Sequence, residues 1–147
     1  MNKPDQLWVL GDLYTFHLST PELAIIEIKV GYESGPPLHS HRSEEETLFV
    51  LEGAVEVCVG TELSNAVPGN FIHFPKGVLH TFRATSPGGA RILVTISPGT
   101  FAQLFREIGV SRAEDAADKH QMDAGKQKLM ELSDMFGLYI PPPPSLQ

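Results

Sequence analysis

The first two-thirds of the chain consist of short apolar runs separated by turn residues. The clearest run is AIIEIKV at 24–30, where isoleucine and valine alternate with Glu27 and Lys29. A period of two residues predicts a strand with one buried face and one solvated face. Similar runs, separated by Gly, Pro and Asn, predict an all-β sandwich or barrel. Further strands are expected at 7–10, 13–16, 47–52, 54–59, 71–74, 80–84 and 92–97.

The run TLFVLE at 47–52 is apolar on both faces. Leu48 and Val50 share one face of the predicted strand, while Phe49 and Leu51 share the other. Such a strand needs a second cover besides its own sandwich. We expect that cover to be either a partner subunit or the C-terminal helices, and on this ground we predict a homodimer.

The hydrophobic period changes after residue 99. Apolar residues at 101, 104, 105 and 108 follow helical spacing and predict a helix over about 100–109. A second helix is expected at about 115–136, although Gly125 weakens it. The four prolines at 141–144 predict an extended surface tail.

The length of 147 residues suits a single domain. We expect residues 1–99 to form a β-barrel with its core at about 24–97. Residues 100–147 would add helices and a proline-rich tail that pack on the barrel or on a partner subunit, within the same domain.

Composition and charge exclude several classes of function. The formal net charge is -7, so nucleic acid and anionic membranes are not expected partners. No apolar run approaches the roughly 18 residues of a membrane span, and the N-terminus lacks the pattern of a secretory signal. Cys58 is the only cysteine, which rules out a disulfide within the chain. Together these features favour a cytoplasmic protein.

Two histidines and a nearby carboxylate suggest metal chemistry. His39 and His41 are two residues apart, so on a strand both imidazoles point to the same side. Glu46 precedes Leu48 by two residues and faces the core if Leu48 does. By the same parity Glu45 points away, and Glu44 is assigned to the solvated bend between the strands. Imidazoles and a carboxylate on one face form the beginning of a metal site.

Two motifs resemble those of the cupin superfamily. The first runs His-x-His, a short spacer, Glu, six residues and Gly, and is matched by His39, His41, Glu46 and Gly53. The second runs from Gly through Pro-x-Gly to His, and is matched by Gly69, Pro75, Gly77 and His80. The second motif normally ends in Asn, where this chain has Ala84. The resemblance extends from about Leu7 to Ser97, and the helical extension is similar to that of small quercetin-dioxygenase-like cupins.

The resemblance implies a double-stranded β-helix, or jelly-roll barrel, with a metal on His39, His41, Glu46 and His80. Three imidazoles and one carboxylate suit Fe, Mn, Co, Ni, Cu or Zn better than Ca or Mg. Four protein ligands leave two positions of a six-coordinate ion open, as in catalytic sites.

His73 is predicted to lie outside the barrel, because Ile72 and Phe74 occupy the inward face of that strand.

The leading hypothesis is a metal-dependent, oxygenase-type enzyme that acts on a small organic molecule. By resemblance to oxygenase cupins, Glu46 would also act as a general base. A metal-dependent isomerase or lyase fits the same ligands. Two alternatives belong to a different class of function. One is a non-catalytic module that binds or senses a small ligand, and the other is a fold kept for assembly.

Overall fold

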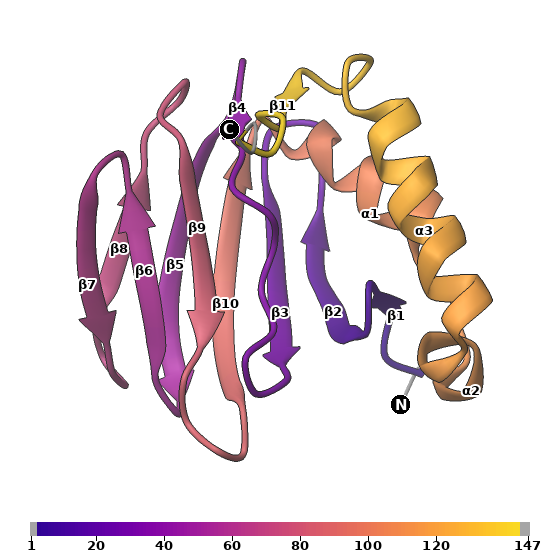
Figure 1. Cartoon of the computed structure of the whole chain (residues 1–147), viewed down its shortest axis with the longest axis horizontal. Coiled ribbons are helices and arrows are strands. Elements are labelled where there is room, and N and C mark those ends of the chain that lie inside the picture. Colours follow the sequence, from indigo (N-terminus) through magenta and orange to yellow (C-terminus); the bar gives the residue numbers. More distant parts are fainter. Residues whose placement is uncertain (1–2, 145–147) are drawn as a thin grey trace.

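The computed structural model describes residues 3–144 and consists mainly of antiparallel strands followed by helices (Figure 1). The strands are β1 (Gln6–Val9), β2 (Asp12–Ser19), β3 (Ala24–Val30), β4 (Ser40–His41), β5 (Glu45–Glu52), β6 (Val55–Val59), β7 (Glu62–Ala66), β8 (Phe71–Phe74), β9 (His80–Ala84), β10 (Ala90–Ser97) and β11 (Leu138–Tyr139). The helices are the 3₁₀ helix η1 (Gly99–Ala102), α1 (Gln103–Ile108), α2 (Ala113–Ala117) and α3 (Lys119–Leu132). The predicted all-β jelly-roll barrel with a C-terminal helical extension is therefore confirmed.

The strands form two facing layers. One is a six-stranded sheet in the order β1-β2-β3-β10-β5-β8, and the other contains β7-β6-β9. The short pair β11-β4 joins the second layer, because His39 and His80 form an isolated antiparallel bridge between the chain before β4 and the start of β9. This bridge brings two distant parts of the sequence together at one end of the sandwich.

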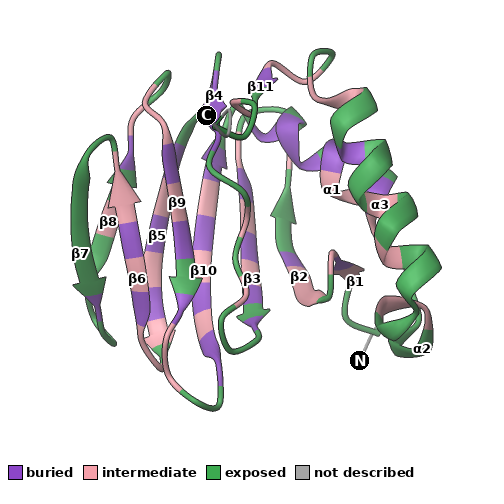
Figure 2. Cartoon of the chain, viewed as in Figure 1, coloured by how far each residue is buried: buried purple, intermediate pink, exposed green. Residues whose placement is uncertain are grey.

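Alternating burial along the strands builds the core between the layers. In β10 every second residue is buried, so Ile92, Val94 and Ile96 face inward (Figure 2). Fully burying such a side chain contributes about 1.5–3 kcal/mol each. The tight turn after β5 depends on Gly53, whose φ is 76° and whose missing Cβ would lie 2.4 Å from the Gly89 carbonyl oxygen. A side chain at this position would therefore push the β5–β6 turn away from the loop before β10.

The C-terminal region departs from the expected single helix over 115–136. The chain forms two helices, because Asp118 adopts an extended conformation and its side chain accepts a hydrogen bond from the Gln121 amide at 3.0 Å. Asp118 is thus the N-cap of α3, which begins as a separate helix. Gly125 lies inside α3 without interrupting it, and its missing Cβ would be 3.2 Å from Leu10. The glycine allows α3 to approach the turn between β1 and β2.

The helices lie beside β1 and β2, at the opposite end of the six-stranded sheet from β5 and β8 (Figure 1). They therefore do not cover the outer face of β5, where Phe49 and Leu51 are half-buried. Within the described residues, none of the helices is long and apolar enough to span a membrane.

Candidate metal centre

Four buried side chains converge where the two layers meet. His39 and His80 are brought together by reciprocal backbone hydrogen bonds of 3.1 and 2.8 Å. His41 follows on β4, and Glu46 reaches the same point from β5 in the opposite layer. One ligand atom from each of these residues lies within 4.8 Å of the other three. The topology thus assembles three imidazoles and one carboxylate from three strands and a connecting segment.

Backbone carbonyls fix the orientation of two of the rings. The His39 Nδ1 atom lies 2.7 Å from the Pro37 carbonyl oxygen, and the His80 Nδ1 atom lies 3.0 Å from the Val78 carbonyl oxygen. Because a carbonyl only accepts, both rings donate from Nδ1, and the neutral His39 ring therefore keeps Nε2 free of a proton. This tautomer leaves the His39 Nε2 lone pair available to the cluster. The His80 Nε2 atom forms a hydrogen bond with Glu46 Oε2 at 3.1 Å.

His41 differs from the other two histidines. Both of its ring nitrogens are buried without a hydrogen-bond partner in residues 3–144. Its Nε2 atom lies 3.0 Å from Glu46 Oε2, but the two are not aligned as a hydrogen bond. Leaving buried polar atoms unpaired is costly. A cation bound beside Glu46 would satisfy the His41 Nε2 atom.

The charge states of the cluster suit a cation. Burial, with the neighbouring His80, lowers the pKa of His39 to about 4, so this ring is neutral near pH 7. Burial by itself raises the pKa of Glu46, but the His41 and His80 rings outweigh it and lower that pKa to about 2. A neutral imidazole and an ionised carboxylate are the forms that bind metals.

The dimensions of the cluster fit a transition metal. Bonds of about 2.0–2.2 Å place ligand atoms on opposite sides of an ion roughly 4.0–4.4 Å apart. The separations within 4.8 Å therefore require shifts of only a few tenths of an ångström. Three nitrogens and one oxygen favour a first-row transition metal over Ca²⁺ or Mg²⁺.

The other residues singled out in the sequence lie elsewhere. His73 is exposed on β8 and lies 2.7 Å from Glu45, which is exposed as well. His17 lies at the surface and contacts Glu27. Cys58 is a free, half-buried thiol whose sulfur lies 3.4 Å from the Gly60 carbonyl oxygen.

Glu44 is the residue that the sequence interpretation missed. Its assignment to a solvated bend was wrong, because the side chain is buried and its Oε1 atom lies 3.7 Å from His41 Nδ1. That oxygen has no hydrogen-bond partner in the described part of the chain. Burial raises the pKa of the Glu44 carboxyl above its usual value. The signal was available in the parity of the strand, because Glu44, Glu46 and Leu48 are each two residues apart.

We expect the Glu44→Gln variant to bind metal about 10- to 100-fold more weakly, because a carboxylate behind a ligating imidazole orients the ring and increases its basicity. Metal affinity is measured by competition with a chromophoric chelator. Glu45→Gln is the matched control, since Glu45 is adjacent but exposed and paired with His73. Equal affinities for the two variants would mean that Glu44 does not orient His41.

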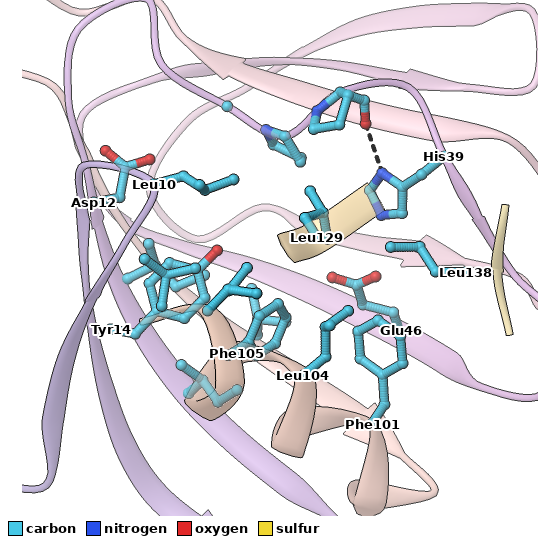
Figure 3. Close-up of a pocket in the computed structure, with 18 of the residues that line it drawn as sticks. Leu10, Asp12, Tyr14, His39, Glu46, Phe101, Leu104, Phe105, Leu129 and Leu138 are labelled. Carbon is cyan, nitrogen blue, oxygen red and sulfur yellow. Dashed lines mark hydrogen bonds between the residues drawn. The ribbon is translucent and has the colours of Figure 1, made fainter. Parts of the chain in front are cut away.

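A cavity of about 90 Å³ opens beside the cluster, and His39, His41 and Glu46 form part of its wall. Most of the remaining wall is apolar and includes Phe82, Val94 and Phe101. Figure 3 shows the Glu46 carboxylate directed into this space, which Leu104 of α1 and Leu129 of α3 also line. The cavity can therefore present a small molecule to the cluster while largely excluding water.

Comparison with known proteins agrees with this geometry. Residues 24–96 match the family described as "Cupin domain". The chain is also 31% identical over 71 residues to quercetin 2,3-dioxygenase of Bacillus subtilis, a match that covers 48% of this chain but 21% of that enzyme. The aligned region is thus about a fifth of the length of the dioxygenase.

Solved structures show the same architecture. An RmlC-like cupin from Shewanella frigidimarina superimposes with a TM-score of 0.60 at 22% identity, covering 65% of this chain and 85% of that chain. KdgF from a Halomonas species gives a TM-score of 0.57 at 24% identity, covering 60% and 79% respectively. At these identities the likeness concerns the fold.

Proposed function

Because the chain belongs to the cupin family, we propose that it is a metal-dependent enzyme of the dioxygenase type that acts on a small organic molecule. The metal would be one divalent transition ion held by His39, His41, Glu46 and His80. The observation that carries the proposal is the buried His41 ring, whose nitrogens have no hydrogen-bond partner in residues 3–144. The dioxygenase character is supported by the distant match to the Bacillus subtilis enzyme.

The residues around the cluster would position and activate the substrate. When bound, the metal would supply Lewis acidity and two open positions for substrate and dioxygen. Glu46 is ionised near neutral pH and would accept a proton from a substrate held against it. The apolar walls of the cavity exclude water, which strengthens these electrostatic interactions.

Metal content combined with turnover under air and under argon tests the proposal. Protein prepared without a histidine tag is analysed for bound metal and then assayed for consumption of small oxygen-bearing compounds. Stoichiometric metal, with turnover that requires dioxygen and stops after chelation, would support the dioxygenase proposal. Turnover that persists under argon would instead favour an isomerase or lyase. Ligand binding that survives chelation without turnover would favour the non-catalytic binding module.

A homodimer is proposed through the outer face of the six-stranded sheet. Leu93, Phe49 and Phe71 are direct cross-strand neighbours on β10, β5 and β8, and Phe71 is 62% exposed. We expect the wild type to be dimeric by light scattering and Phe71→Lys to be monomeric, because a lysine in an apolar interface would lose its hydration. A monomeric wild type would contradict this.

A further inference from the structure

The cavity is built largely by parts of the chain that the family match does not include. Eleven of the twenty-one lining residues lie outside residues 24–96, four before that segment and seven after it. The later group belongs to η1, α1, α3 and the segment around β11, and includes Phe101, Leu104, Leu129 and Leu138. The ligand preference of this cavity is therefore a property of this chain rather than of the shared domain.

The polar groups of the cavity are concentrated at two separate ends. His39, His41 and Glu46 form one end, and Asp12 and Tyr14 from β2 form the other (Figure 3). Apolar side chains, including Leu129 of α3, line the space between them. A ligand that fills the cavity would therefore be apolar in its middle and polar at both ends.

Of Asp12 and Tyr14, only Tyr14 lacks a side-chain hydrogen-bond partner among residues 3–144. The Asp12 carboxylate accepts from the Gly31 amide at 2.9 Å and from the Ser34 hydroxyl at 2.8 Å. The Tyr14 ring packs edge-on against Phe105, with the centroids 5.0 Å apart. Its hydroxyl makes no hydrogen bond with a side chain in residues 3–144 and faces the cavity.

Tyr14 acts as a donor in this position. Burial raises the pKa of its hydroxyl, and the negative charges of Asp12 and Glu46 raise it further, so the group stays protonated at physiological pH. Asp12 already accepts from two donors, and no side chain among residues 3–144 accepts the Tyr14 proton. The complementary group on a ligand is a hydrogen-bond acceptor such as a carbonyl oxygen.

We propose that the cavity binds a mainly apolar small molecule that presents an oxygen chelate to the metal and a hydrogen-bond acceptor to the Tyr14 hydroxyl. The chelating part of this inference rests on the proposed function, whereas the Tyr14 contact rests on the cavity itself. Tyr14 is thereby a residue that determines specificity.

The test compares acetyl- and isopropyl-substituted benzoates, with the substituent at each ring position, on the Zn²⁺-loaded protein by calorimetry. The two substituents have similar shapes, and an apolar wall alone would favour isopropyl. We expect one acetyl isomer to bind about fivefold more tightly than its isopropyl counterpart because of one additional hydrogen bond. Tyr14→Phe should abolish this preference, and Tyr32→Phe should retain it, since Tyr32 is exposed.

The outcomes separate this inference from the proposed function, because bound zinc is measured in the same samples. Stoichiometric zinc without an acetyl preference, or with a preference that Tyr14→Phe retains, would overturn the Tyr14 contact and leave the metal site intact. A Tyr14-dependent preference in protein that binds no zinc would overturn the metal site and the chelating head group, but not the Tyr14 contact.

Discussion

The His80→Ala variant is expected to bind Zn²⁺ or Co²⁺ at least about 100-fold more weakly than the wild type, because even residues behind a metal ligand change affinity by 10- to 100-fold. His80 is 1% exposed, and its Nε2 atom lies 3.1 Å from Glu46 Oε2. Alanine removes one of the four proposed ligands and leaves the Glu46 carboxylate with one fewer partner. Metal affinity is measured by chelator competition, and Co²⁺ absorbance reports the change in coordination.

His73→Ala is the matched control for this substitution. His73 lies seven residues earlier in the sequence, yet it is exposed and paired with Glu45 on the outer face of β8. Thermal unfolding of the metal-free proteins, with His80→Gln as a bulkier replacement, separates ligand loss from misfolding. Unchanged affinity in a folded His80→Ala protein would contradict the four-ligand site.

The strands with a buried face could be predicted because a buried face requires apolar residues at regular positions in the sequence. β3 and β8 have the boundaries expected from their apolar residues. β7 was missed because its sequence, ELSNA, is mostly polar and exposed, and only its pairing with β6 makes it a strand. β11 was missed for a related reason, since its two residues pair with β4 and contribute little pattern of their own.

More of the metal cluster than of the cavity beside it could be predicted from the sequence. The spacing of His39 and His41 indicates a shared face, whereas placing His80 beside them required the family resemblance, because the bridge to His39 joins residues 41 positions apart. The opposite end of the cavity has no comparable motif or residue spacing in the sequence. Tyr14 belongs to an ordinary strand pattern, and its role emerges only when α1 and α3 close the space beside it.

Phe74→Ala is the substitution with the largest expected cost to stability. Phe74 is 1% exposed and lies opposite Glu46 in the β5–β8 pairing. Truncating a buried phenylalanine to alanine costs about 3–5 kcal/mol, a large share of the 5–15 kcal/mol that typically stabilises a domain. Tyr32→Ala is the control, because Tyr32 is 55% exposed and should change the free energy of unfolding by no more than about 0.5 kcal/mol.

The same substitution tests whether the core holds the metal cluster in place. The Phe74 ring stacks on His80 with the centroids 4.3 Å apart and the planes within 14°. If this stack fixes the ring, Phe74→Ala will also weaken metal binding, and added metal will raise its unfolding temperature less than that of the wild type. If the affinity is unchanged while stability falls, the Val78 carbonyl is sufficient to orient His80, and Phe74 serves packing alone.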